Sequence, residues 1–68
     1  MRTFSLFITH IGSKTPTLQF EFAPTLASIG LIARSALGRT LNGRYVEVYE
    51  DDRLCFTLDA NANVQPAG

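Results

Sequence analysis

The sequence contains a single cysteine, Cys55, and a single histidine, His10. One cysteine excludes an internal disulfide, and the pair falls short of the four ligands that a structural zinc site requires. A core in a chain of 68 residues supplies only about 3–5 kcal/mol of net stability. Because 46% of the residues are hydrophobic, and neither an internal disulfide nor a structural zinc site is available, we expect a homo-oligomer without a metal or cofactor.

Neither sign of charge is in excess, since six basic residues balance six acidic ones. This balance argues against general attraction to nucleic acid or to an acidic membrane. Long hydrophobic runs are also absent, and Thr3, Ser5 and Thr9 interrupt the apolar N-terminal stretch. Together with the unpaired cysteine, these absences lead us to expect a soluble cytoplasmic protein. Small interaction proteins of bacterial or mobile-element type would suit this description.

Hydrophobic periodicity predicts four strands and one helix. Apolar residues alternate with others over 3–9 and over 17–22, which is typical of half-buried strands joined as a hairpin. From residue 26 the apolar spacing changes to three and four, which indicates a helix over 25–37. Strands over 44–50 and 53–58 follow, so the fold class is α+β with the element order ββαββ.

Local residues predict how these elements begin and end. Thr25 is a good N-cap and Gly38 a good C-cap for the helix, and Gly30 would allow the helix to approach the sheet closely. A two-residue loop in the second hairpin would bury the Glu47 carboxylate, at a cost of several kcal/mol. We therefore expect a loop of odd length. The side chains expected to face the helix are then Phe4, Leu6, Ile8, Leu18, Phe20, Phe22, Val46, Val48, Leu54, Phe56 and Leu58.

The connection between the two hairpins predicts the strand order. A right-handed crossover through the helix would leave a gap that the first and fourth strands fill as parallel neighbours. The expected sheet is therefore four-stranded and mixed, in the order 2-1-4-3. In element order alone, this arrangement resembles the β-grasp, the architecture of ubiquitin-like proteins. Residues 1–58 form this single domain, and we expect 59–68 to be a flexible C-terminal tail.

The face of the sheet away from the helix is the predicted interaction surface. Exposed aromatic residues that cluster on a sheet are typical of protein interfaces, although scattered surface aromatics need no functional explanation. Leu31 lies on the far side of the predicted helix and is a further candidate contact. The predicted protein-interface residues are Phe7, Tyr45, Tyr49, Cys55 and Leu31.

Catalysis has little support in this sequence. Cys55 and His10 are the only pair that suggests a nucleophile with its base, and the predicted strand order places them far apart. The acidic residues 50–52 lie in a predicted turn and lack the spacing of a calcium loop. We therefore expect a protein that is not an enzyme and has no catalytic, metal-binding or small-molecule residues.

Arg34, Arg39 and Arg44 form the alternative site. They lie near the end of the helix and the start of the third strand, where they could contact phosphate while Tyr45 stacks on a base. Their other role is to compensate the helix dipole. The sequence therefore favours a protein-protein interaction module of adaptor, inhibitor or regulatory type, homodimeric through the open sheet face, and leaves nucleic-acid binding as the alternative.

Overall fold

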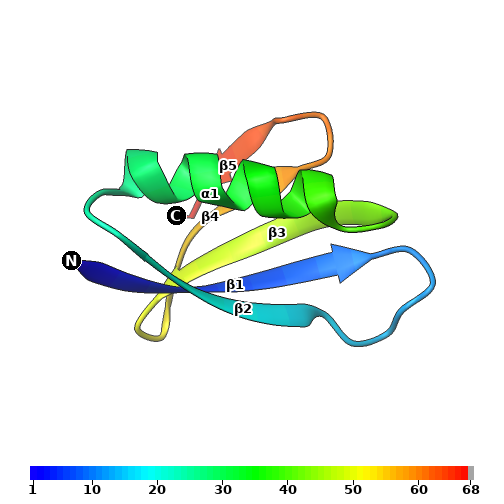
Figure 1. The fold of residues 1–68 in the computed structure, drawn as a ribbon, viewed down its shortest axis with the longest axis horizontal. Helices are drawn as coiled ribbons and strands as arrows, with labels where there is room; N and C mark the ends of the chain where they lie inside the picture. The colour runs from blue at the N-terminus through cyan, green and yellow to red at the C-terminus, as the bar shows by residue number, and fades with distance from the viewer. Residues whose placement is uncertain (68) are drawn as a thin grey trace.

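The computed structural model describes residues 1–67, which form one helix packed on one antiparallel sheet of five strands (Figure 1). No helix within this range is long and apolar enough to cross a membrane. The elements in chain order are β1 (Arg2–His10), β2 (Thr17–Ala23), α1 (Leu26–Arg39), β3 (Gly43–Glu50), β4 (Arg53–Asp59) and β5 (Val64–Pro66).

The strand order is β2-β1-β3-β4-β5, and every neighbouring pair is antiparallel. The α+β class is confirmed, but the predicted order 2-1-4-3, with its parallel central pair, is wrong. The likeness to the β-grasp ends with it. The two longest strands, β1 and β3, pair directly in the centre, where Leu6 faces Val48 and Ile8 faces Val46. Antiparallel pairing is slightly more stable per residue than parallel pairing, and this order needs no parallel neighbours.

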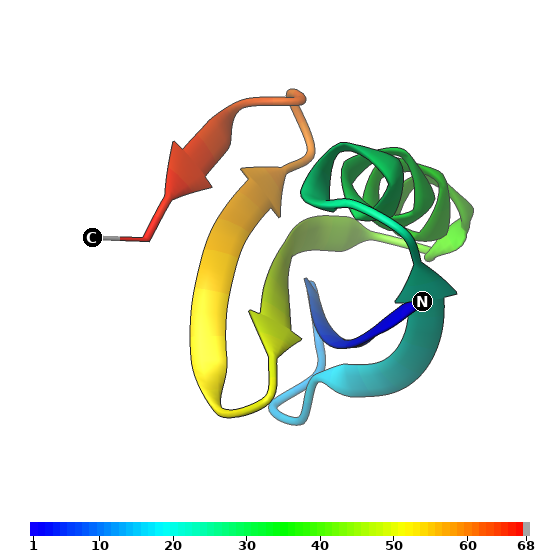
Figure 2. The same cartoon turned by 90° about the vertical axis from the view of Figure 1, so that its left-hand side faces the viewer.

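The fifth strand, β5, was not predicted. It pairs with β4 over three residues, with Val64 opposite Leu58 and Pro66 opposite Phe56. All three β5 residues are exposed, so the hydrophobic pattern carried no signal of a buried strand. Figure 2 shows β5 at the far edge of the curved sheet, while α1 packs on β1, β2 and β3.

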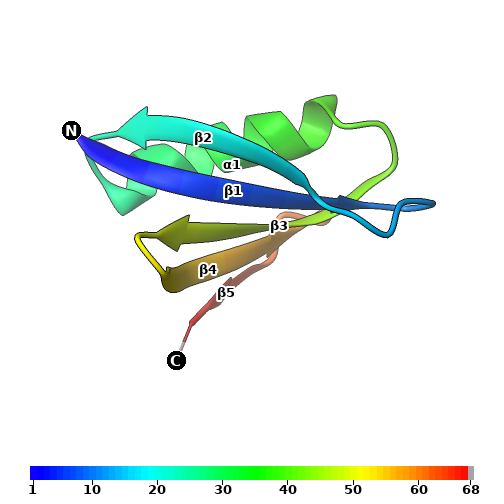
Figure 3. The ribbon, with the colours of Figure 1, turned by 90° about the horizontal axis from the view of Figure 1, so that it is seen from below.

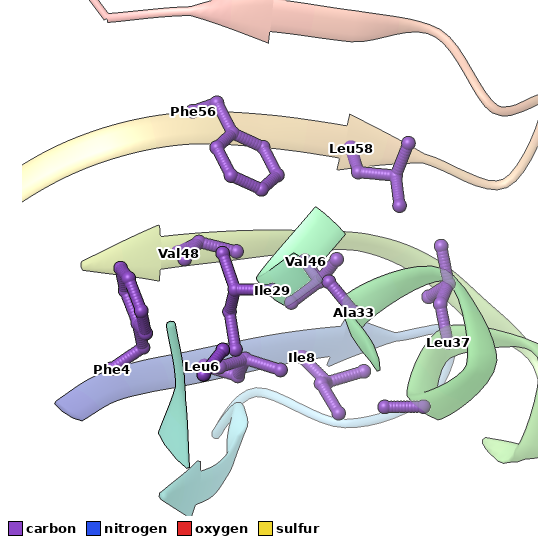
Figure 4. Packing of buried hydrophobic residues seen from close by; sticks show 12 residues of the cluster. Phe4, Leu6, Ile8, Ile29, Ala33, Leu37, Val46, Val48, Phe56 and Leu58 are labelled. Carbon is purple, nitrogen blue, oxygen red and sulfur yellow. The ribbon is translucent and has the colours of Figure 1, made fainter. Parts of the chain in front are cut away.

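The core lies between α1 and the face of the sheet beneath it, including part of β4 (Figure 4). Its members come from every long element, and the largest fully buried side chains belong mainly to β1 and β3. The predicted inward positions of β1, β3 and most of β4 are therefore confirmed. The buried cluster comprises Phe4, Leu6, Ile8, Ala23, Ile29, Ala33, Ala36, Leu37, Val46, Val48, Phe56 and Leu58.

The prediction for β2 is wrong in its facing. Directly opposed residues in an antiparallel pair share a face, and Leu18, Phe20 and Phe22 lie opposite Phe7, Ser5 and Thr3. These three apolar side chains therefore point away from α1. Ala23 is the inward residue and is 1% exposed, immediately before the chain turns into the helix. Because faces alternate strictly, an inward Ala23 turns every even-numbered residue of β2 outward.

A β-bulge sets the register of the second hairpin. Glu50 pairs with Arg53 across a two-residue turn, so the predicted loop of odd length is wrong. The register shifts between Val48 and Tyr49. Val48 pairs with Phe56, whereas Tyr49 pairs with Leu54, so Cys55 is the extra residue of β4. One extra residue in β4 thus returns the later positions to the core face, which is the effect that the odd loop was expected to have.

Of the two helix caps predicted from the sequence, only the N-cap is found in the structure. Thr25 caps the helix as predicted, since its Oγ1 accepts a hydrogen bond from the Ser28 backbone N–H at 3.1 Å. The C-cap is Thr40, whose hydroxyl donates to the Ala36 carbonyl at 2.9 Å, and Gly38 belongs to the last turn. The hydroxyl satisfies one of the free carbonyl groups at the helix end, so no left-handed glycine is needed there.

Candidate interaction surface

The sheet face opposite α1, called the open face below, carries the largest exposed aromatic group of the described residues. Figure 3 views the molecule from this side, where none of the described elements covers the strands. On β2, Leu18 is 48% exposed, Phe20 64% and Phe22 63%. We call these three side chains the β2 ridge. Full burial of one such side chain contributes about 1.5–3 kcal/mol, so the ridge leaves a substantial stabilisation unused.

Phe7 and Tyr49 continue the apolar surface toward the middle of the open face. Their ring centroids are 5.3 Å apart, and the ring planes meet at 81°, which is the favourable edge-to-face geometry. Ser5 lies between Phe20 and Tyr49 in the cross-strand row, so a small residue separates two aromatic ones. The open face therefore carries aromatic side chains on the strands at both sides of β1, with the small Ser5 between them.

A shallow hollow of about 320 Å³ opens on this face beside Phe7 and Tyr49. Its rim includes the carboxylates of Glu47, Asp51 and Asp52. The β2 side of the open face is thus apolar, and the side near the β3–β4 turn is acidic. Glu47 is exposed enough to remain solvated there, and the side chain avoids the buried position that an even register without a bulge would impose.

The structure brings together only part of the predicted interface set. Phe7, Tyr45 and Tyr49 lie on the open face, on the neighbouring strands β1 and β3. Cys55 instead packs against the core cluster and lines a separate apolar hollow beside the first turns of α1. Leu31 is 70% exposed on the solvent side of α1, remote from the open face. The roles of these residues in binding stay predictions.

The three arginines come from the second half of α1 and the start of β3. Arg34 lines a hollow between the end of α1 and the β4–β5 loop. Arg39 follows five residues later in the helix, which at 3.6 residues per turn places it about 140° around the axis. Arg44 is exposed at the start of β3 and is not among the residues that line that hollow. The nucleic-acid alternative therefore stays a prediction.

Cys55 and His10 lie near opposite ends of the sheet. His10 pairs with Gly43 at the start of β3, whereas Cys55 follows Leu54, the partner of Tyr49. About six residues of strand, at roughly 3.3 Å each, separate these positions. The thiol donates to the Arg53 carbonyl at 3.8 Å, and His10 Nε2 lies 3.2 Å from the Thr17 hydroxyl. Within residues 1–67, no group of three or more His, Cys, Asp or Glu side chains could hold a metal ion.

Two carboxylates have specific partners that lower their pKa. Arg2 donates through Nε and a terminal nitrogen to both oxygens of Glu50, at 2.8 and 2.6 Å, and these hydrogen bonds lower the pKa of Glu50. The pKa of Asp59 is lowered chiefly by the backbone N–H of Asn63 and also by that of Asn61, both of which donate to Oδ1. Both carboxylates stabilise local structure, since they join β1 to β3 and order the β4–β5 loop.

The β2 ridge is the part of the surface that the sequence did not reveal. Alternation in 17–22 separates Leu18, Phe20 and Phe22 from Thr17, Gln19 and Glu21, but it does not say which set faces the helix. The one local signal is Ala23, a small apolar residue next to the chain reversal at Pro24-Thr25. With Ala23 facing inward, the ridge faces outward.

Comparisons with known proteins found no relative. No protein-family model matches the chain, and no curated protein or solved structure matches it significantly.

Proposed function

We propose that this protein is a small non-catalytic protein-protein interaction module that binds through the open face, with a second copy of the chain as its partner. The observation that carries this proposal is the β2 ridge, in which three large apolar side chains of one strand are half to two-thirds exposed. The ridge adjoins the Phe7–Tyr49 ring pair, so the apolar surface extends over three neighbouring strands. Contiguous apolar patches of this kind mark interaction sites.

Energetics favour a covered surface. The three ridge side chains together would gain about 4 kcal/mol on burial, given their partial exposure. This is comparable with the roughly 3–5 kcal/mol that a core in so small a domain supplies. The burial gain is therefore of the same order as the net stability of the isolated chain, and it offsets part of the entropy cost of association.

The test compares two apolar-to-polar variants on opposite sides of the molecule. We expect Phe20→Thr to weaken self-association at least tenfold, since a hot-spot aromatic contributes 2 kcal/mol or more at the centre of an interface, by order of magnitude. Leu31→Gln is the contrasting variant, because this leucine is similarly exposed but lies on α1, on the other side of the molecule. Light scattering across a hundredfold concentration range measures the association constants. Association that survives Phe20→Thr but is lost in Leu31→Gln would transfer the binding surface to the helix.

A further inference from the structure

The outer edge of β2 is a long, regular pairing edge that carries one inward charge, Glu21. In the described part of the chain, no strand pairs with this edge, because β2 is the first strand of the sheet order. Edge strands are usually blunted by prolines, bulges, short length or inward charges. β2 has seven residues, its register with β1 is regular throughout, and Glu21 is its only charged residue. The opposite edge, β5, has three residues and ends at Pro66.

The sequence of β2 is self-complementary about its central residue. A two-fold axis perpendicular to the sheet keeps each residue on its own face, so antiparallel pairing of identical strands is centred on a residue. When Phe20 is the centre, Phe20 faces its own copy, Leu18 faces Phe22, and Gln19 faces Glu21. The apolar residues then meet on the open face, and each carboxylate meets an amide on the other face.

Other registers are less favourable. Pro16 and Pro24 flank the strand and lack the N–H group that a ladder needs, so only 17–23 can pair fully. A centre at Glu21 would place the two carboxylates directly opposite one another, which is destabilising. A centre at Gln19 would shorten the overlap to five residues. Only the centre at Phe20 uses all seven residues and avoids a repulsive pair.

We propose that a second copy of the chain binds at the β2 edge, in antiparallel register about Phe20, so that two five-stranded sheets form one continuous sheet. The inference rests on the proposed function, since it specifies how the open-face ridge is used. Across the two-fold axis, the two ridges become adjacent and form a single apolar cluster of six side chains, three from each copy. Main-chain hydrogen bonds between the two β2 strands supply the remainder of the contact.

Gln19 distinguishes edge pairing from any packing of one open face on another. Gln19 and Glu21 are the half-buried residues of β2, opposite Leu6 and Phe4 on the helix side of the sheet, and the Gln19 amide donates to Glu21. In face-to-face packing, neither side chain enters the interface. In edge pairing, Gln19→Lys creates two charge pairs with Glu21 of the opposite copy, whereas Gln19→Glu creates two repulsive pairs.

The experiment measures the dimer dissociation constant of both variants by light scattering at low and high salt. We expect Gln19→Lys to tighten and Gln19→Glu to weaken the dimer at low salt, each by roughly threefold to tenfold, and the differences to shrink at high salt. Ser35→Lys and Ser35→Glu are the matched controls, because they change net charge equally at an exposed position on α1. Amide hydrogen exchange gives a second readout, since pairing protects the outward N–H groups of β2 in the dimer.

The outcomes separate this inference from the proposed function. Opposite shifts of the two Gln19 variants, with unchanged Ser35 controls, support edge pairing. Wild-type affinity in both Gln19 variants, together with loss of association in Phe20→Thr, overturns edge pairing and leaves the open face as the binding surface. A wild-type chain that stays monomeric at every concentration overturns the inference and the second copy as partner.

Discussion

At the scale of single residues, Gly30 and Gly43 occupy positions where the space around a side chain differs. A Cβ at Gly30 would lie 4.0 Å from the Phe56 ring, an ordinary contact, so the helix does not approach the sheet too closely for alanine. A Cβ at Gly43 would lie 2.8 Å from Leu37 Cδ1 and 3.1 Å from the Leu37 carbonyl oxygen. The chain passes so close to the helix end there that an added Cβ would force the Leu37 side chain and carbonyl to shift.

We expect Gly30→Ala to raise the free energy of unfolding by about 1 kcal/mol, because alanine is the better helix former and its methyl group meets Phe56. Gly43→Ala is the contrasting variant and should lower the free energy of unfolding, since the added carbon overlaps Leu37. Urea unfolding monitored by circular dichroism measures both values. A destabilised Gly30→Ala variant would mean that the helix packs closer to β4 than the 4.0 Å distance to the Phe56 ring indicates.

At the scale of elements, the loop that leads into β5 is ordered in part by one carboxylate. Asp59 ends β4 and accepts hydrogen bonds from Asn61 and Asn63, which turn the chain back toward β4. Ala62 in the same loop has a φ of 65°, a left-handed conformation that a non-glycine residue adopts only when its surroundings impose it. The loop is therefore held by the Asp59 side chain more than by the preference of its residues.

We expect β5 to detach from β4 in acid before the core unfolds. The folded pKa of Asp59 lies below its ordinary value, so its contribution is present above that value and is lost as the pH falls through the folded pKa, below about 4. Protection factors of the β5 amides, corrected for intrinsic exchange rates, should fall in this range. Asp59→Ala should show the low protection already at neutral pH. Equal protection in the variant and the wild type at neutral pH would contradict this account.

Much of the element level could be predicted from the sequence, and the reasons for the failures are specific. Alternation and helical spacing identified β1, α1, β3 and β4, because each has one face or stripe that enters the core. The facing of β2 and the strand order could not be predicted, because they depend on pairing between distant strands. β5 could not be predicted, because its side chains are exposed and it pairs with β4 through the backbone. Backbone pairing leaves no hydrophobic pattern in the sequence.

Part of the candidate site could be predicted, because the facing of some strands followed from their hydrophobic pattern and that of others did not. Phe7, Tyr45 and Tyr49 belong to strands whose inward faces were predicted correctly, so their outward position followed. Phe20 was assigned to the core because its strand reads equally well in both orientations. The bulge in β4 likewise moved Cys55 away from the aromatic group, and a bulge of one residue leaves no hydrophobic signature.

At the scale of the whole molecule, charge and apolar surface are separated. The apolar ridge occupies one edge of the open face, and the carboxylates of the hollow lie near the β3–β4 turn. Arg34 and Arg39 belong to α1, on the other side of the sheet. This separation keeps charges out of the proposed contact between two ridges.

We expect the melting temperature of the wild type to rise with concentration, by about 3–5 °C for each tenfold increase, because only the folded chain associates. Phe20→Thr should melt at a lower temperature than the wild type at each concentration, because its association is weaker. Calorimetry over three concentrations tests both statements. A constant melting temperature in the wild type would show that association contributes nothing to its stability.

The short β5 strand limits how far such a sheet can grow. Pairing about a two-fold axis consumes the β2 edge of both chains, so only the β5 edges stay at the ends of the joined sheet. Each of these ends has three residues, and Pro66 removes one of the backbone donors that a further strand would need. If two chains pair in this way, addition would stop at two chains, and the apolar strand that joins them would not seed an endless ribbon or fibril.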